Sequence, residues 1–207
     1  MALVKYNNNS ISAVTSAASI PSGAMTHIKT LTASSSATLS FVDGTDSVVL
    51  DSTYPIYKFE FINIHSQNNS VDLTFNFSTD SGSNYNVTKT TTHFWTANYE
   101  SLALNYFTYG ASLDLAQSTS FQIITDNVGN ENDESSSGTM TLFNPSSTTF
   151  VKHFMTDIST YGQDNSAYRN LVAGYGNTTS AVDAIRFQMA SGNIDAGQIK
   201  LYGIKDS

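Results

Sequence analysis

Hydrophobic and polar residues alternate along most of the chain after about residue 24, with the two-residue period of β-strands. The alternation is clearest over residues 57–64, which carry aromatic residues on one face, and over residues 71–77, which repeat the pattern. A polar turn at residues 67–70 joins the two segments. We therefore expect them to pair as an antiparallel hairpin.

Further segments share the length and pattern of strands and are separated by turn residues such as Asp43 and Gly44. Strands at a spacing of about eight to twelve residues are typical of sandwiches and jelly rolls. We therefore expect an all-β fold, an antiparallel, jelly-roll-like β-sandwich, with one helical turn near residues 180–184 and a less regular stretch at 98–120. The other expected strands are residues 25–31, 37–42, 48–50, 90–97, 119–124, 139–143, 149–158, 169–175, 184–189 and 198–204.

Residues 1–24 differ from this body because they are mostly small and polar, with single apolar residues among them. A frayed chain terminus is one interpretation. The alternative is an N-terminal docking arm over residues 1–24, followed by a single sandwich domain over residues 25–207. Such an arm would bind a neighbouring subunit or shell through its apolar residues, which are Leu3, Val4, Tyr6, Ile11, Val14 and Ile20.

The composition suits one all-β domain. Of the 207 residues 40% are hydrophobic, enough for one sizeable core, and only 13% are charged. Cysteine is absent, which excludes disulfides, thiolate catalysis and cysteine-bound zinc and suits synthesis in a reducing cytoplasm. The first residues lack the pattern of a secretory signal, and no apolar run approaches membrane-spanning length. We expect no membrane insertion.

The charge pattern argues against nucleic acid as a partner. The formal net charge is −8, and the nine basic residues are scattered along the chain. Proteins that bind nucleic acid gather lysine and arginine into a patch or stripe that neutralises phosphates. No such stripe is present in the sequence, so we do not expect binding to DNA or RNA.

Metal ligands are also poorly arranged in the sequence. Carboxylate and amide oxygens crowd residues 126–134 and could hold calcium, but their spacing does not match an EF-hand loop. We favour a solvated acidic loop. The four histidines, His27, His65, His93 and His153, lie far apart and form no H-x-H or HExxH pair. We therefore expect no metal and no cofactor.

Catalytic motifs give no support for an enzyme. The chain has no G-x-S-x-G elbow, no phosphate-binding P-loop and no dinucleotide fingerprint. Glycoside hydrolysis needs two positioned carboxylates, and although a pair among the 17 acidic residues is conceivable, most of them are expected on turns. A hydrolase is the least favoured class, and we expect a non-enzymatic protein.

An aromatic run is the best candidate for a binding surface. Trp95, Tyr99, Tyr106 and Tyr109 lie in or beside the irregular stretch at 98–120. Exposed tryptophan and tyrosine stack on sugar rings or anchor protein interfaces. The alternative is that the neighbouring Phe94 and Phe107 belong to the core and the remaining rings are half-buried.

Five segments of the chain carry a further signal, namely IPSGAM at residues 20–25, LTASSSATL at 31–39, KFEFINIH at 58–65, LFNPSSTTFVKHF at 142–154 and SGNIDAGQIKLYGIK at 191–205. These segments resemble a family of small virion structural proteins of marine tailed bacteriophages, which are decoration-like or fibre-like. The likeness covers nearly the whole chain, and its motifs are structural rather than catalytic.

The resemblance implies a non-enzymatic protein on the particle surface, either a capsid decoration or cement protein or a tail-associated, fibre-like protein. The expected partners are other virion proteins and further copies of the same chain, most simply in a homotrimer, after synthesis in the host cytoplasm. The sequence leaves one alternative open, which is a host-recognition module of a tail fibre that binds a cell-surface glycan.

Overall fold

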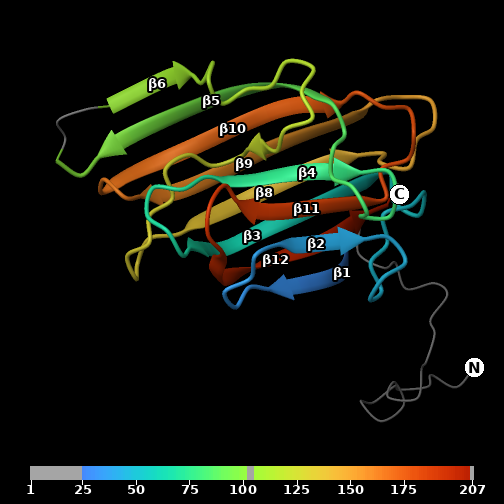
Figure 1. Ribbon diagram of the computed structural model, residues 1–207, viewed down its shortest axis with the longest axis horizontal. Coiled ribbons are helices and arrows are strands. Elements are labelled where there is room, and N and C mark those ends of the chain that lie inside the picture. The colour runs from blue at the N-terminus through green and yellow to red at the C-terminus, as the bar shows by residue number, and fades with distance from the viewer. Residues whose placement is uncertain (1–24, 102–104, 206–207) are drawn as a thin grey trace, which may run out of the picture.

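The computed structural model describes residues 25–101 and 105–205, which form two antiparallel β-sheets packed face to face (Figure 1). The large sheet has eight strands in the order β1-β12-β3-β8-β9-β10-β5-β6, and the small sheet has four in the order β2-β11-β4-β7. This architecture confirms the all-β antiparallel sandwich expected from the sequence. The strands are β1 (Met25–Thr32), β2 (Leu39–Val42), β3 (Ile56–Ser66), β4 (Leu73–Ser78), β5 (Lys89–Tyr99), β6 (Asn105–Tyr109), β7 (Gln122–Ile123), β8 (Ser136–Phe143), β9 (Lys152–Gly162), β10 (Ser166–Gly176), β11 (Ala184–Met189) and β12 (Ile194–Ile204).

The expected hairpin between residues 57–64 and 71–77 is wrong. Both segments form strands, but β3 pairs with β12 and β8 in the large sheet, whereas β4 pairs with β11 and β7 in the small sheet. The polar turn between them carries the chain from one sheet to the other. Alternation identified the core face of β4 and that of β3 as far as Phe61, but a register shift beyond Phe61 exposes Asn63 and buries Ile64. It did not identify the partner of either strand, because the inner faces of both sheets supply the same core.

The other expected strands are present except that at residues 48–50, and several differ in extent. Residues 48–50 form no strand, although Val48 and Leu50 are buried. The segment 119–124 is reduced to the two-residue strand β7, and the described residues 180–184 contain no helical turn. β6 lies inside the stretch that the sequence marked as less regular, so this edge strand was not expected.

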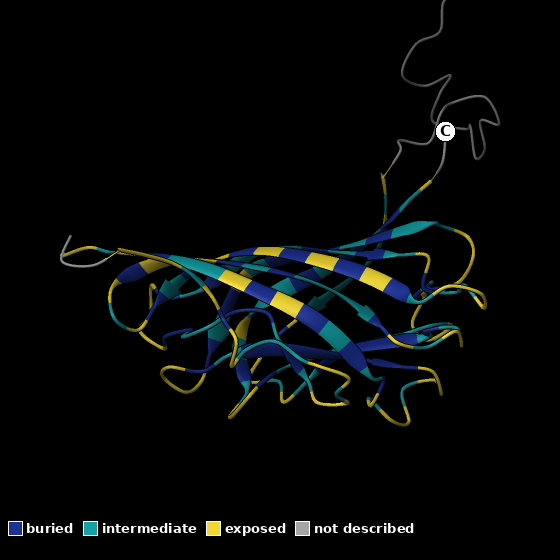
Figure 2. Cartoon of the chain, turned by 90° about the horizontal axis from the view of Figure 1, so that it is seen from above, coloured by how far each residue is buried: buried dark blue, intermediate teal, exposed yellow. Residues whose placement is uncertain are grey.

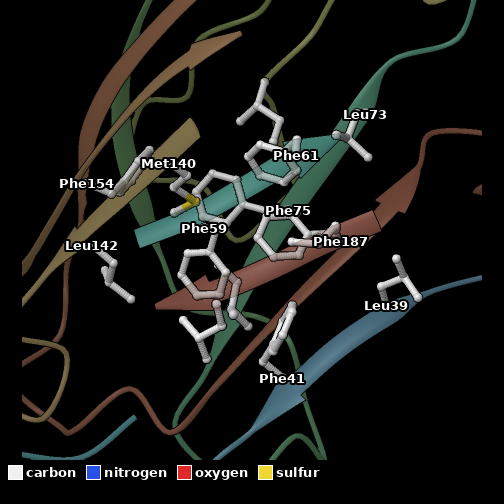
Figure 3. Close-up of a cluster of buried hydrophobic side chains, with 14 of the residues drawn as sticks. Leu39, Phe41, Phe59, Phe61, Leu73, Phe75, Met140, Leu142, Phe154 and Phe187 are labelled. Carbon is white, nitrogen blue, oxygen red and sulfur yellow. The ribbon is translucent and has the colours of Figure 1, made fainter. Parts of the chain in front are cut away.

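Phenylalanine rings from both sheets fill the centre of the core (Figure 3). Phe187 of β11 is completely buried, and its ring centroid lies 5.2 Å from that of Phe61 and 5.5 Å from that of Phe59 in the facing sheet. Phe41 and Phe75 of the small sheet lie 6.4 and 6.3 Å from it. Most of these rings meet edge to face, an arrangement that adds to the free energy gained from burial.

A bulge fixes how β12 enters the large sheet. Its pairing with β3 shifts register twice between Ile194 and Gln198. Gly197 lies within the bulge and has a φ of +112°. A Cβ atom at Gly197 would lie 2.4 Å from the backbone oxygen of Asn63, which is itself at positive φ. Only glycine accommodates both the backbone conformation and this close approach.

Two lysines, Lys89 of β5 and Lys152 of β9, are fully buried. They lie in one cross-strand row, because both pair with Gly176 of β10. The Nζ atom of Lys89 donates to Oδ1 of Asn76 at 2.5 Å and to the Val87 carbonyl at 2.9 Å. That of Lys152 donates to two backbone carbonyls, at 2.8 and 3.1 Å. Burial lowers the pKa of both lysines, that of Lys89 to about 7.

Candidate functional site

The four aromatic residues expected to form one binding surface lie on two opposite faces of the large sheet. Successive residues of a strand alternate between faces, and the pairing of β5 with β6 and β10 places Trp95, Tyr99 and Tyr106 on the inner face, which packs against the small sheet. Tyr109 lies on the outer face, opposite Phe94. No single ligand contacts all four side chains across the sheet.

The inner-face residues form a packed cluster with Tyr168 of β10. The ring of Trp95 lies 5.7 Å from that of Tyr168 and 6.0 Å from that of Tyr106, and the Tyr99 ring lies 6.2 Å from the Tyr106 ring. The hydroxyl of Tyr168 donates to Asp164 at 2.8 Å. Contact with Tyr168 raises the pKa of Tyr99. Trp95 is therefore mainly a packing residue, and only Tyr106, 43% exposed, offers a ring to solvent.

A buried polar group lies beside this cluster. His93 and Asn170 are fully buried, and Nε2 of His93 lies 3.1 Å from Oδ1 of Asn170. Burial lowers the pKa of His93, against smaller opposing effects of Asn170 and Asp126. Thr156, also buried, lies in the same cross-strand row as His93. These groups are enclosed between the sheets, so His93 is a neutral structural residue rather than an accessible base.

The outer face carries an aromatic ridge formed by Phe94, Phe107 and Tyr109. The rings of Phe94 and Phe107 stack at 6.3 Å with an interplanar angle of 15°, and Tyr109 meets Phe94 edge to face at 5.1 Å. Phe107 is 76% exposed and Phe94 38%. The alternative that Phe94 and Phe107 belong to the core is thus wrong. Side chains alternate between the two faces of a sheet, and both rings lie on the face directed away from the small sheet.

Next to the ridge, the outer face is hollowed into a groove over β9, β10 and the start of β5. The main hollow has a volume of about 510 Å³, and a second hollow of about 200 Å³ continues it toward Phe94 and Leu171. The two share Thr92, Met155 and Ala173, so they form one outer groove. Thr90, Phe143, His153 and Tyr175 also line it from the outer face.

The charged residues beside this groove neutralise each other. Arg169 of β10 donates from Nε and Nη2 to the two carboxylate oxygens of Asp157 of β9, at 2.9 and 2.7 Å. The guanidinium lowers the pKa of Asp157. Both side chains are about half exposed. The bidentate pair leaves this part of the outer face without net charge, although the whole chain carries −8.

The acidic loop borders a polar hollow of about 500 Å³. Nδ1 of His65 lies 3.7 Å from a carboxylate oxygen of Asp195, and Nε2 lies 3.0 Å from the Glu131 carbonyl. Glu134 is buried, and its carboxylate accepts the amide of Glu131 at 2.7 Å. Over residues 25–101 and 105–205, no three histidine, aspartate or glutamate side chains are grouped to hold a metal ion.

The fold brings together one carboxyl pair that the sequence did not reveal. Asp72, just before β4, and Asp126, just after β7, are partly buried and share a side-chain hydrogen bond. Burial raises the pKa of both, that of Asp72 to about 6, with a further contribution from the neighbouring Asp126. Direct contact leaves no room for a substrate or water between them, so the pair fits a structural role.

A further hollow of about 340 Å³ lies where β5 and β9 end and β10 begins. Tyr99 and Tyr161 line it together with Asn98 and Glu100. The Tyr161 hydroxyl donates to Asn165 at 3.1 Å and lies 3.4 Å from a Glu100 carboxylate oxygen. Aromatic rings beside amide and carboxylate groups are suited to a small polar ligand such as a sugar.

Sequence reasoning missed most of the outer groove. The signal was present, because β5, β9 and β10 carry apolar residues on the set of positions opposite the core, among them Met155, Leu171 and Ala173. A solvated antiparallel sheet face is normally polar. The expected arm contacts Leu3, Val4, Tyr6, Ile11, Val14 and Ile20 lie outside the described residues.

No family model matches this chain, and neither a curated protein nor a solved structure matches it. Within the described ranges no helix has the length and apolar character needed to cross a membrane.

Proposed function

We propose that this protein is a non-enzymatic structural protein on the surface of a tailed-bacteriophage particle, a capsid decoration protein or a tail-associated, fibre-like protein. It would act by binding other protein surfaces, including further copies of itself. The resemblance of five sequence segments to small virion proteins supports the class of protein. The exposed outer face of the large sheet supports the mode of action.

One observation carries the proposal. Seven large hydrophobic side chains of the described residues are markedly exposed, and four of them, Phe94, Phe107, Tyr109 and Met155, gather on the outer face of β5, β6 and β9. The small sheet packs on the opposite face, so no described element covers them. Contiguous exposed apolar surface of this kind marks sites of protein association.

The titratable groups also favour a structural role. His93, the carboxyl pair of Asp72 and Asp126, and the buried Lys89 all take part in internal hydrogen bonds between or beside the sheets. None of these four residues lines the hollows at the surface described above. Their shifted pKa values follow from burial and bear on stability rather than on turnover.

Attachment to the particle is assigned to residues 1–24. The described residues begin with β1, an edge strand of the large sheet, and all twelve strands lie within residues 25–205. Removing these residues is therefore expected to leave the two sheets intact. This division gives a direct test of where the protein acts.

The test compares phage particles that encode the full chain with particles that encode residues 25–207. After purification on a density gradient, the amount of this protein per particle is measured by quantitative mass spectrometry, and circular dichroism checks the fold of the purified variant. We expect the full chain to remain on the particle and the folded variant to be lost. Absence of the full chain from purified particles would overturn the proposed function, and retention of the variant would overturn the role of residues 1–24.

A second candidate function is recognition of a host glycan, favoured by the hollow beside Tyr99 and Tyr161. A glycan array with the full-length protein tests it, with Tyr161→Ala as the variant, because Trp95 is largely a packing residue. Binding that Tyr161→Ala abolishes without loss of fold would support a recognition module. No binding by the wild type on an array of host surface sugars would exclude it.

A further inference from the structure

The outer face of the large sheet carries more apolar side chains than a solvent-exposed sheet face normally does. Figure 2 shows buried and exposed residues alternating along the strands of this sheet on one side of the molecule. Exposed positions of an antiparallel sheet normally carry polar side chains. Here the exposed set contains the aromatic ridge and the outer groove, which lie next to each other over β5, β6, β9 and β10.

The ridge and the groove have complementary shapes. The ridge projects three aromatic rings, with Phe107 the most exposed. The groove is hollowed because Thr92 and Ala173 are small, while Met155 and Tyr175 form taller walls. Its lining is mainly apolar, so a projecting aromatic ring from another surface would bury apolar area against it.

The symmetry of the contact follows from the placement of the two features. Ridge and groove belong to the same face of one sheet and therefore point in the same direction. A half turn about an axis that lies in the contact plane, between ridge and groove, places each ridge in the groove of the other copy. Such an isologous contact uses the same surface on both copies and ends at a dimer. It buries both ridges and fills both grooves at once.

The charge and the size of the face also suit a second copy of the chain. Two molecules that each carry −8 repel each other, but the groove borders the internally neutralised pair of Arg169 and Asp157. Strands β5, β9 and β10 have 11 residues each, about 36 Å in length, and the five strands from β8 to β6 span about 19 Å. The resulting area of roughly 700 Å² approaches the ~800 Å² per partner of a standard interface.

We propose that two copies of this chain pair through the outer faces of their large sheets, with the aromatic ridge of each copy seated in the outer groove of the other. The inference rests on the self-association in the proposed function and specifies its surface. It assigns a two-fold dimer to this contact, where the sequence resemblance implied a homotrimer. The partner that fills the outer groove is a second copy of this chain. If the groove instead bound a glycan, residues 1–24 or another virion protein, the purified wild type would not form a dimer that Met155→Arg weakens.

The test measures the mass of the full-length protein by light scattering and its dissociation constant by sedimentation equilibrium. We expect twice the 22.4 kDa of one chain. Met155→Arg places a charge in the groove, and Tyr109→Glu places the opposite charge on the ridge. Each variant alone is expected to weaken the dimer by at least about 30-fold, the effect of losing an interface hot spot.

The matched control is Tyr106→Glu. Tyr106 and Tyr109 lie on the same strand and are both 43% exposed, but on opposite faces. The control is expected to remain a dimer, and circular dichroism with thermal melting checks that all variants stay folded.

Mixing Met155→Arg with Tyr109→Glu tests the pairing itself. In the mixed dimer one ridge-and-groove contact gains an opposite charge pair and the other keeps the native side chains, so we expect the mixture to recover a dimer. A wild-type monomer or trimer at ~100 μM would overturn the inference, as would a dimer that Met155→Arg leaves unchanged. Particle retention of the wild-type protein is measured in parallel, because a wild type that is monomeric in solution but stays on the particle refutes this contact and leaves the virion role in the proposed function standing.

Discussion

The buried Lys89 makes the stability of this protein depend on pH in a way that the structure allows to be worked out. Its side chain is fully buried, and its Nζ atom is held by Asn76 and the Val87 carbonyl, both uncharged. Burial lowers the pKa of Lys89 in the folded protein from 10.5 to about 7. Between these values the unfolded chain binds a proton that the folded chain does not bind.

The sign of the effect follows from this difference in bound protons. Stability rises with pH wherever the unfolded state binds more protons. The loss of folding free energy caused by burying Lys89 is therefore full below pH ~7 and disappears as the pH rises toward 10.5. At about 1.4 kcal/mol per pH unit, the whole window corresponds to about 5 kcal/mol, and the interval from pH 7 to pH 9 to about 2 kcal/mol.

Lys89→Met removes the titrating group and keeps the length of the side chain. Urea unfolding at several pH values from 6 to 9.5 gives the free energy of unfolding of wild type and variant. The difference in free energy of unfolding between Lys89→Met and wild type should change by about 2 kcal/mol in favour of wild type between pH 7 and pH 9. All other titrating groups are common to both proteins, so they cancel in the difference.

The control is Lys58→Met, because the side chain of Lys58 is partly exposed and pairs with Glu60 at the surface. Its unfolding free energy should run parallel to that of wild type over the same pH range. A difference between Lys89→Met and wild type that stays constant within ~0.5 kcal/mol would refute the reasoning, since it would mean that Lys89 keeps its proton in the folded state.

Three further predictions concern the core, the carboxyl pair and the bulge. Phe187→Ala should lower the free energy of unfolding by about 3–5 kcal/mol because the ring is fully buried; a loss under 2 kcal/mol in urea unfolding would contradict this. The pKa of Asp72 is raised to about 6, so the contribution of Asp72 to stability should fall by roughly 1–2 kcal/mol as the pH rises from 4 to 7, and thermal melts should show the stability of wild type relative to Asp72→Asn falling by that amount. Gly197→Ala should cost more than 2 kcal/mol, because its Cβ atom would meet the backbone at 2.4 Å, whereas Gly44→Ala, with nothing within 4 Å of its Cβ atom, should cost about 1 kcal/mol; equal losses in parallel melts would rule out the backbone clash.

The sequence determined the class of fold and most of the strands. Alternation at a period of two marks a face for burial, and that is a local property which survives in any sheet. It placed Phe59, Phe61, Phe75 and Phe187 in expected strands, and all four rings lie in the core. Alternation did not predict which strands pair with each other, because β3 and β4 show the same pattern although they lie in different sheets.

The candidate site depended on the tertiary structure to a larger degree. The sequence marked the aromatic run around Trp95 and Tyr109 but treated it as one surface. Only the register of β5 against β6 and β10 separates an inner packed cluster from an outer ridge. The groove escaped sequence reasoning because its walls come from Phe143, Met155 and Tyr175 on three different strands.

The sequence by itself therefore determined an all-β sandwich without cysteine chemistry, with low charge and with alternating buried faces, since these properties follow from residue types and their local spacing. The tertiary structure decided which strands are neighbours, that Asp72 meets Asp126, that Lys89 is buried, and which aromatic residues share the outer face. Each of these facts depends on contacts between residues distant in the chain, whose free energies local patterns do not record.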